Sequence, residues 1–331
     1  AFDWLSHRGP DESREMISDN FYMGFHRLSI VGINNKKASQ PIKFNRGNCT
    51  LMFNGEIYNY KEIAKERLPT DQVNEEVLGS DTLILKLLLE KYDLDCLEWL
   101  DGMFSIAIIN DKNGSVKLIR DRYGIKPLYY MIKNNNIIFS SHIKPIVDIS
   151  NYKILNKNAI YTYLSEGLYD HSEQTFFKDV LSVPPGSVLE FNLNSKLIKK
   201  FRWYKIENYL CLEDSINQLD ILDEIDNTLN EVITNYIPQE VPFAINISGG
   251  VDSTLLVSKV KEHYQNDFLL LNQDYIPPYS ERPWIEEFSE FLNVSPSYHL
   301  ITPDSILEDL SETFKYQFQP FGGVTVPGYT P

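Results

Sequence analysis

The 331-residue sequence has few cysteines, fewer basic than acidic residues and no long hydrophobic segment. Its three cysteines, Cys49, Cys96 and Cys211, are scattered and odd in number, so they form neither a disulfide framework nor a metal-ligand spacing. This usage indicates a reducing cytoplasm. No apolar run approaches the roughly 18 residues that cross a bilayer, and no export leader is recognisable at the start. The sequence therefore predicts neither a membrane partner nor secretion.

The charge balance restricts the class of ligand. Lysine and arginine total 31 against 46 acidic residues, which gives a net charge of -15. Such a chain is repelled by nucleic-acid phosphates, so we expect no nucleic-acid partner. A nucleotide can still bind, because N–H groups at a loop and a helix N-terminus act locally. The six histidines are dispersed without metal-ligand spacing.

The length and the two ends bear on domain organisation. A chain of 331 residues exceeds what one hydrophobic core usually organises, so two domains are predicted. The sequence lacks an initiator methionine, begins at Ala1 in what reads as mid-element, and stops at Pro331. We therefore expect a fragment of a longer protein.

Short β-rich segments dominate residues 1 to about 205. Several flank turn-rich residues such as Asp111-Lys112-Asn113-Gly114. The predicted hairpins are Met103–Asn110 with Ser115–Arg120, Leu128–Lys133 with Ile137–Ser141, and Gly186–Leu193 with Leu197–Trp203. Further β-rich runs are Phe21–Val31 and Cys49–Phe53, and helices are predicted at Asp81–Tyr92 and Asn156–Glu166. This order predicts an α+β domain, an antiparallel sheet with helices packed outside.

Strands and helices alternate from about residue 212 onward. The predicted order is helix Leu212–Tyr236, strand Phe243–Ile247, helix Ser253–Tyr264, strand Phe268–Asn272, helix Ser280–Leu292, strand Tyr298–Ile301 and helix Ile306–Phe314. These strands read as apolar on both faces, which predicts a doubly wound parallel α/β sheet covered on each side. The boundary falls near 204–212, giving domains 1–206 and 212–331.

Ser248-Gly249-Gly250-Val251-Asp252-Ser253 lies between the first of these strands and its helix. The glycines permit a positive φ and close approach of a ligand to the backbone. Serine hydroxyls and the helix N-terminus favour a pyrophosphate. Asp252 is suited to Mg²⁺. A tight turn is the simpler alternative, but the full Ser-Gly-Gly-x-Asp-Ser pattern favours the site.

Two better-known nucleotide loops are excluded here. No Gly-Lys-Ser/Thr follows, as a Walker A loop requires, and the spacing is not Gly-x-Gly-x-x-Gly. The pattern resembles the loop of ATP pyrophosphatases, which cleave ATP between the α and β phosphates to activate a carboxylate as its adenylate.

Four segments stand out in the front part, and each alone has a structural explanation as a turn, a helix cap or a surface charge. They are His7–Asp11, His26–Val31, Asn54–Asn59 and Gly79–Asp81. In this order they resemble the glutaminase domain of glutamine-dependent asparagine synthetases, a class II amidotransferase. Leu100–Phe104, Asp121–Tyr130 and Pro184–Gly186 are also similar to that family, so the resemblance covers nearly the whole chain.

The resemblance implies a fold and a glutamine site. The fold is an N-terminal-nucleophile-type αββα sandwich of antiparallel sheets. Arg27 would bind the glutamine α-carboxylate, and Glu56 and Asp81 its α-ammonium group. Asn54 and the Gly55 N–H would form the oxyanion hole. The pocket would be lined by the backbone of Leu28, Ser29, Ile30 and Val31.

The chain departs from the family at the nucleophile, which is a cysteine at the mature N-terminus. Neither Cys49 nor Cys96 can offer a free α-amine, so this chain as given is expected not to hydrolyse glutamine. We favour loss of an N-terminal segment over a domain that binds without cutting. The family's later Ser-Gly-Glu-Gly-Ser-Asp-Glu segment is also absent, so we expect the rear domain to be C-terminally incomplete.

The resemblance also implies an ATP site. Its residues would be Ile247, Ser248, Gly249, Gly250, Asp252, Ser253 and Leu270, with Asp252 on Mg²⁺. Glu281 and Arg282, after Pro277-Pro278, belong either to a substrate-side loop or to a helix cap.

Three functions stay open at this stage. The leading one is synthesis of asparagine from aspartate and glutamine, with ATP and Mg²⁺, by a cytoplasmic enzyme. A homodimer is one assembly that such an enzyme could form. The rivals are a β-lactam synthetase-like or other adenylating amidotransferase, and a non-catalytic glutamine- or ATP-binding regulator. The intact set of Arg27, Asn54, Gly55, Glu56 and Asp81 favours the first.

Overall fold

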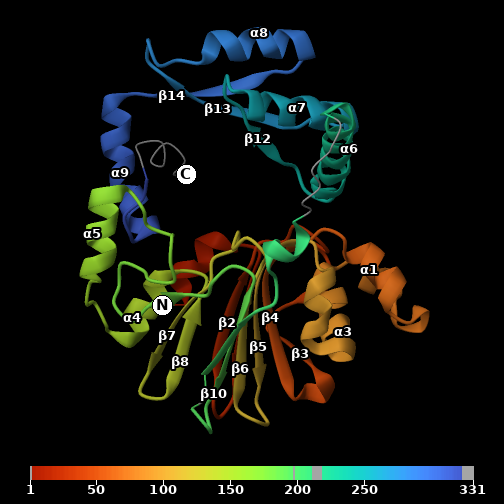
Figure 1. The fold of residues 1–331 in the computed structure, drawn as a ribbon, viewed down its shortest axis with the longest axis vertical. Coiled ribbons are helices and arrows are strands. Elements are labelled where there is room, and N and C mark those ends of the chain that lie inside the picture. Colours follow the sequence, from red (N-terminus) through yellow and green to blue (C-terminus); the bar gives the residue numbers. More distant parts are fainter. Residues whose placement is uncertain (1, 197, 211–217, 323–331) are drawn as a thin grey trace. The chain divides into compact units, whose positions relative to one another are not determined.

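The computed structural model describes residues 2–196, 198–210 and 218–322. The chain divides into two compact units, residues 1–210 and 211–331 (Figure 1). Within the described ranges, no helix has the length and apolar character needed to cross a membrane.

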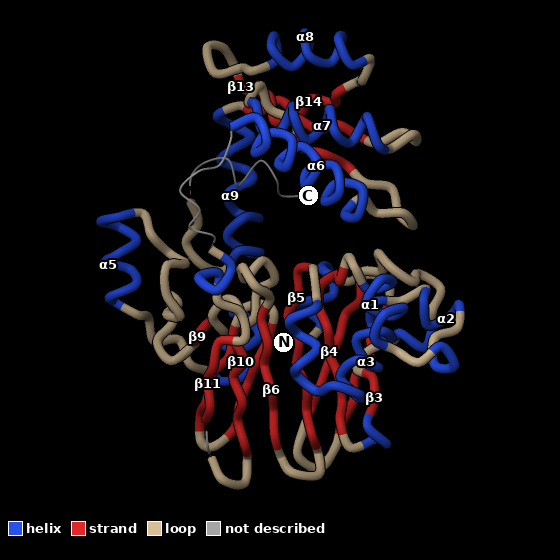
Figure 2. The backbone as a smooth tube through the Cα atoms, turned by 45° about the vertical axis from the view of Figure 1, so that its right-hand side comes forward, coloured by secondary structure: helices blue, strands red, loops and turns tan. Residues whose placement is uncertain are grey.

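A six-stranded antiparallel sheet forms the centre of the first unit, in the order β11-β10-β6-β5-β4-β3 (Figure 2). Two smaller antiparallel sheets, β1-β2 and β8-β7-β9, accompany it. The strands are β1 (Glu12–Ile17), β2 (Tyr22–Arg27), β3 (Ile42–Phe44), β4 (Cys49–Ile57), β5 (Gly102–Asn110), β6 (Ser115–Arg120), β7 (Tyr129–Lys133), β8 (Asn136–Ser140), β9 (Leu181–Ser182), β10 (Ser187–Asn192) and β11 (Ile198–Arg202). The helices are α1 (Tyr60–Arg67), α2 (Glu75–Leu78), α3 (Asp81–Tyr92), α4 (Ile143–Ser150) and α5 (Lys157–Glu166).

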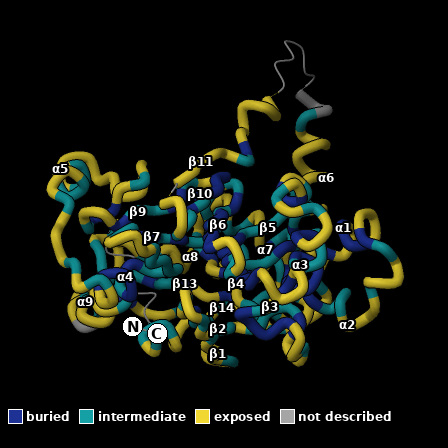
Figure 3. Tube along the Cα trace, turned by 90° about the horizontal axis from the view of Figure 1, so that it is seen from below, coloured by how far each residue is buried: buried dark blue, intermediate teal, exposed yellow. Residues whose placement is uncertain are grey.

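Two cores lie on opposite faces of the six-stranded sheet. Along β4, Leu51 and Phe53 enter the core shared with α1 and α3, whereas Met52 enters the core shared with β2 and β7. This alternation is the period of two of a strand that is covered on both faces. The central strands are accordingly buried (Figure 3).

A second helical layer completes the first unit. The buried side chains of α4, Ile143, Ile146 and Val147, belong to a helix that packs on β7 and β8. The order of layers is therefore helices, sheet, smaller sheets, helix. This confirms the predicted αββα sandwich of antiparallel sheets.

The second unit contains a parallel sheet in the order β12-β13-β14. Its elements are α6 (Gln218–Tyr236), β12 (Ala244–Asn246), α7 (Val251–His263), β13 (Leu269–Tyr275), α8 (Arg282–Leu292), β14 (Pro296–Ile301) and α9 (Pro303–Gln317). Ile233 of α6, Val257 of α7 and Ile285 of α8 share one core with Leu270 of β13. The predicted parallel sheet is confirmed.

The expected covering of both sheet faces is not found in the described part of this unit. Leu270 is buried, whereas its neighbours Leu269 and Leu271 are 61% and 40% exposed. Helices α7 and α8 both pack on the face of Leu270, as expected when successive parallel crossovers of the usual right hand advance in the same direction along a sheet.

Most predicted elements are present, with shifts at their ends. The three hairpins are confirmed, and α3 spans the predicted residues. The run Phe21–Val31 is a strand only to Arg27, because residues 28–32 turn away as a loop. Of the helix predicted at Leu212–Tyr236, residues 212–217 lie outside the described ranges. The predictions missed β1, β3, β9, α1, α2 and α4.

Candidate functional site

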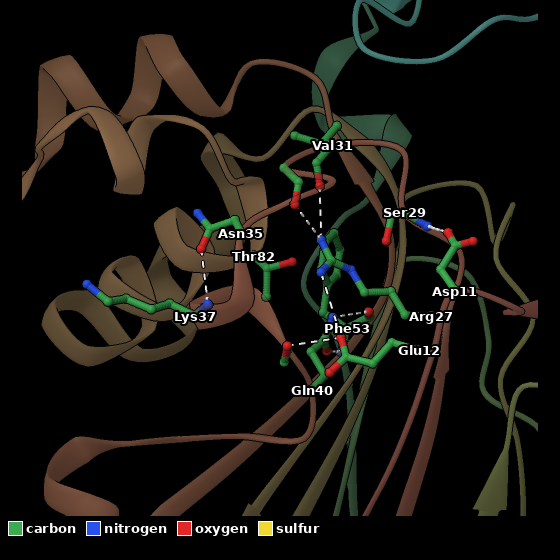
Figure 4. Close-up of polar contacts among 12 residues, drawn as sticks. Asp11, Glu12, Arg27, Ser29, Val31, Asn35, Lys37, Gln40, Phe53 and Thr82 are labelled. Atoms are coloured by element: carbon green, nitrogen blue, oxygen red, sulfur yellow. Dashed lines mark hydrogen bonds and ion pairs between the residues drawn. The ribbon is translucent and has the colours of Figure 1, made fainter.

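Arg27, the last residue of β2, organises the loop that follows it. Its Nη2 donates to the carbonyl oxygens of Val31 at 3.2 Å and Gly32 at 3.0 Å. Its Nη1 lies 3.9 Å from Oε2 of Glu12, and only 11% of the side chain is exposed. Figure 4 shows the guanidinium between the loop carbonyls and Glu12. A planar group with five donors can hold this loop and still offer an N–H edge to a carboxylate.

The His7–Asp11 segment fixes the end of β2. Asp11 accepts a hydrogen bond from the Ser29 N–H at 2.6 Å, and its own N–H donates to the Arg27 carbonyl at 3.0 Å (Figure 4). A Cβ on Gly9 would lie 2.4 Å from the carbonyl carbon of His26. Only glycine allows this approach, which explains the local sequence without a catalytic role.

The strand carrying Asn54 is tied down immediately before that residue. The side chain of Gln40 forms two hydrogen bonds with the backbone of Phe53, at 3.0 and 2.5 Å. Gly55 follows with φ +151°, and a Cβ there would lie 2.0 Å from the carbonyl oxygen of Met103 on β5. A glycine is required at this position. The predicted oxyanion donors, Asn54 and Gly55, therefore lie on a backbone held from both sides.

Asp81 begins α3, capped by Ser80, whose side chain accepts from the Leu83 N–H. Its carboxylate accepts from the N–H groups of Thr82 at 2.6 Å and Ile57 at 3.3 Å. The second bond joins α3 to β4 one residue after Glu56. Asp81 is 4% exposed. The two carboxylates predicted to bind an ammonium group are thus brought together.

Burial shapes the protonation of this pair. It raises the pKa of the Asp81 carboxyl to about 7; the bonds from Ile57 and Thr82 oppose that shift, and the nearby Glu56 adds to it. Burial also raises the pKa of Glu56, against the opposing influence of the Lys126 ammonium. An arriving α-ammonium group would favour the ionised forms of both carboxyls. The arrangement can therefore bind a cation by taking the pair to its charged state.

The loop of Gly32 brings Arg27 to the same place. A Cβ on Gly32, whose φ is +65°, would lie 2.6 Å from the carbonyl oxygen of Gly79, next to the cap of α3. The loop that the Arg27 side chain holds through the Val31 and Gly32 carbonyls thus lies against the start of α3. This brings Arg27 toward Asp81, the residue predicted to bind the other end of a zwitterionic amino acid. Leu28 is 56% exposed, whereas Ser29, Ile30 and Val31 are partly buried.

The sequence does not identify Asp121 as a site residue, although it begins the motif Asp121–Tyr130. It is completely buried, and its carboxylate accepts four backbone N–H bonds, from Phe104, Tyr123, Ile125 and Lys126, at 2.9 to 3.2 Å. These bonds fold the loop that presents Lys126 toward Glu56. Burial lowers the pKa of Lys126, and Glu56 raises it.

The loop of the second unit is closed by its serines. The Ser253 hydroxyl accepts from the Ser248 N–H at 3.0 Å and lies 2.9 Å from the Ser248 hydroxyl, which also accepts from the Gly250 N–H at 3.3 Å. Asn272 on β13 donates to the carbonyl of Ile247 at 2.8 Å. These bonds curl the backbone at the N-terminus of α7. N–H groups in such a curl favour an anion.

The glycines of this loop are needed for the room that they leave and not for a positive φ. Neither Gly249 nor Gly250 has a positive φ, contrary to the sequence-based expectation. A Cβ on Gly249 would contact the Cβ atoms of Trp284 and Glu281 at 3.4 and 3.5 Å. A larger residue would therefore fill the space where α8 approaches the loop.

Asp252 is exposed in the first turn of α7. Among the described residues, no cluster of three or more histidine, cysteine, aspartate or glutamate side chains is placed to hold a metal ion. A lone carboxylate beside the predicted phosphate site nevertheless suits Mg²⁺, which commonly takes one or two carboxylates and completes its shell with phosphate oxygens and water.

Ile247 and Leu270, predicted to meet adenine, are buried at 3% and 2% exposure. The Ile247 N–H donates to the Leu271 carbonyl, and its own carbonyl is engaged by Asn272. Leu270 pairs with strands on both sides. The main-chain groups of Ile247 and Leu270 are thus hydrogen-bonded within the second unit. An adenine base would therefore contact these residues chiefly by van der Waals packing at the ends of their strands.

Cys49 and Cys96 are buried and unlinked by disulfides. Cys49 begins β4 and Cys96 lies in a 3-10 turn over Asp93–Trp99, so neither carries a terminal amine. Burial raises the pKa of Cys49 and takes that of Cys96 to about 12. Both thiols are therefore kept protonated. Cys211 lies outside the described ranges.

Comparison with known proteins matches both units to described families. Residues 1–204 match a glutamine amidotransferase domain, and residues 224–329 match asparagine synthase. Asparagine synthetase [glutamine-hydrolyzing] 2 of Bacillus subtilis is 30% identical over 82% of this chain and 37% of its own length. A Methanocaldococcus jannaschii protein is 26% identical over 96% of this chain and 64% of its own.

A fungal relative of the chain is named as an amidase and not as an asparagine synthetase. The amidase chry2 of Gibberella zeae is 27% identical over 88% of this chain and 42% of its own length. The chain thus spans between 37% and 64% of the length of these three relatives. With an amidotransferase domain over its first 204 residues and an asparagine synthase domain behind it, the chain belongs to the family of glutamine-dependent asparagine synthetases.

Proposed function

We propose that the protein to which this chain belongs makes L-asparagine from L-aspartate, with ammonia taken from L-glutamine. Glutamine and water give glutamate and ammonia at the first unit. At the second, aspartate attacks the α-phosphorus of ATP, giving β-aspartyl-AMP and pyrophosphate. Ammonia then displaces AMP from the acyl phosphate and leaves asparagine. The observation that carries this proposal is the presence, in one chain, of a zwitterion-type site and a pyrophosphate-type loop.

The glutamine half rests on the convergence at the ends of β2 and β4. The guanidinium of Arg27 would bind the α-carboxylate through two N–H groups. The carboxylates of Glu56 and Asp81 would bind the α-ammonium group. Attack on the side-chain amide develops negative charge on its oxygen, which the Asn54 amide and the Gly55 N–H would stabilise. Leu28 to Val31 would line the pocket.

The thiolate that this chemistry requires is supplied by neither described cysteine. The attacking sulfur must be near the oxyanion donors and ionised. Cys49 and Cys96 are buried thiols whose pKa values are raised. We therefore propose that this chain binds glutamine and that the nucleophile is no residue between Phe2 and Leu210.

The adenylation half rests on the loop before α7. The N–H groups of Ser248 to Ser253 would receive the β and γ phosphates, which leave as pyrophosphate. The helix N-terminus favours that negative charge. Bound Mg²⁺ would neutralise phosphate charge, and Asp252 would hold it. Ile247 and Leu270 would lie against the base.

The test is pyrophosphate release by the full-length protein. We expect release that depends on aspartate, ATP and Mg²⁺ and that is supported by glutamine or by added ammonia. Release with ammonia alone would assign synthesis without glutaminase activity. Absence of aspartate-dependent release would contradict the proposal and favour another acceptor carboxylate, as in a β-lactam synthetase-like enzyme. Glutamine and ATP binding with no turnover of either would favour a regulatory protein.

A further inference from the structure

One donor of the proposed pyrophosphate loop already holds an anion. The Gly249 N–H donates to Oε2 of Glu281 at 3.1 Å. Glu281 is 32 residues further along the chain and precedes α8 as its N-terminal cap residue. A carboxylate on a loop N–H occupies the kind of position that a phosphate oxygen would take, since both are oxyanions accepting a charge-assisted hydrogen bond.

The residues on either side hold Glu281 in this position. Ser280 donates its hydroxyl to the buried carboxylate of Asp274 on β13 at 2.6 Å. Arg282 lies 3.8 Å from the other oxygen of Asp274, and its guanidinium lies 4.3 Å from the ring centroid of Tyr298. Both neighbours of Glu281 are thereby anchored to the sheet. These contacts fix the backbone that carries Glu281, and its carboxylate lies against the loop.

The close approach at Gly249 supports the same conclusion. Its missing Cβ leaves the Cβ atoms of Trp284 and Glu281 at contact distance from the loop. The beginning of α8 is thus packed on the backbone that would receive pyrophosphate. An anion that arrives there must compete with the Glu281 carboxylate for the Gly249 N–H. The negative charge of that carboxylate also repels the arriving anion.

We propose that Glu281 is an anion latch that sets the affinity of the loop for pyrophosphate and for the phosphates of ATP. In the chain without ligand its carboxylate occupies the Gly249 N–H. A polyphosphate displaces it, because several N–H and hydroxyl groups then act on one ligand, whereas a singly charged anion cannot compensate for the lost carboxylate contact. This inference rests on the proposed adenylating function of the second unit.

The experiment is a titration of the chain with inorganic pyrophosphate, with and without Mg²⁺, followed by calorimetry and by tryptophan fluorescence. Trp284 lies beside Gly249 and is 61% exposed, so its emission reports on the loop. The variants are Glu281→Gln, which keeps the shape, and Glu281→Ala, which removes the acceptor. Glu287→Gln is the control, because it removes the same charge from an exposed position of α8.

We expect Glu281→Gln and Glu281→Ala to bind pyrophosphate about tenfold more tightly than the wild type, a change of about 1.4 kcal/mol. Glu287→Gln should bind like the wild type. Unchanged affinity in both Glu281 variants would overturn the latch. Weaker binding only in the presence of Mg²⁺ would also overturn it, by assigning the carboxylate to the metal. Absence of binding in every variant would overturn the adenylating function itself.

Discussion

The close approach of β4 and β5 at Gly55 gives the sharpest prediction for the first unit. A Cβ at this position would lie 2.0 Å from the carbonyl oxygen of Met103 and 2.7 Å from the Cα of Phe104. Ordinary contact begins at 3.4 Å, so the strands would have to separate by 1.4 Å (3.4 minus 2.0). The two strands pair continuously from Cys49 to Ile57, which leaves no room for that movement.

The cost of Gly55→Ala has two parts. Overpacking of a tight interior costs about 1–3 kcal/mol. A φ of +151° is unfavourable for alanine and adds about 1–3 kcal/mol. Gly47→Ala is the matched control, because Gly47 also has a positive φ, +82°, but nothing within 4 Å of its Cβ position. Gly47→Ala therefore has the conformational cost of a positive φ without the cost of overpacking.

The assay is urea unfolding followed by the fluorescence of Trp203, whose ring lies 6.1 Å from that of Phe104 and so reports on the affected strand. We expect Gly55→Ala to lower the free energy of unfolding by about 2 kcal/mol more than Gly47→Ala does. It should also weaken glutamine binding, because a displaced Gly55 shifts the neighbouring Glu56 on the same strand. Equal stability of the two variants would refute the argument from close approach.

Three further predictions concern charge and hydrogen bonding at the two sites. Since burial raises the pKa of Asp81 to about 7, folding takes up a proton, and stability should fall by about 4 kcal/mol between about pH 4 and 7. Urea unfolding of Asp81→Asn at several pH values should show a shallower fall, and an unchanged slope would count against the buried carboxyl. Arg27→Lys should weaken glutamine binding about tenfold or more in calorimetry, whereas Arg14→Lys on the exposed side of β1 should not. Ser253→Ala, which removes the acceptor of the Ser248 N–H, should weaken ATP binding about tenfold; equal weakening by Ser258→Ala would show a general effect on α7.

The sequence predicts regular elements well where one local signal decides. Asp111 to Gly114 sets a hairpin, and Ser80 with Asp81 starts α3 where a cap and an apolar stripe coincide. The sequence overextends the strand that ends at Arg27, because the bonds of the Arg27 side chain to the Val31 and Gly32 carbonyls decide where the strand ends. Such hydrogen bonds do not follow the periodicity of a helix or a strand, so the sequence pattern does not predict them.

The site residues fall into the same two classes. Residues in short motifs, such as Arg27 and Gly55, could be named before the structure. Asp121 and Glu281 could not be given their roles, because each acts through backbone N–H groups that the fold brings to it. The same applies to Gln40, which holds β4 from a loop 13 residues away.

The proposed function requires that the amide nitrogen of glutamine ends in the amide of asparagine. The most direct measurement supplies the full-length protein with aspartate, ATP, Mg²⁺ and glutamine carrying a heavy-nitrogen label on its side-chain amide, and analyses the products by mass spectrometry. We expect labelled asparagine in equal amount to AMP and pyrophosphate. Label in another amide, or label that stays in glutamine while ATP is cleaved, would contradict it.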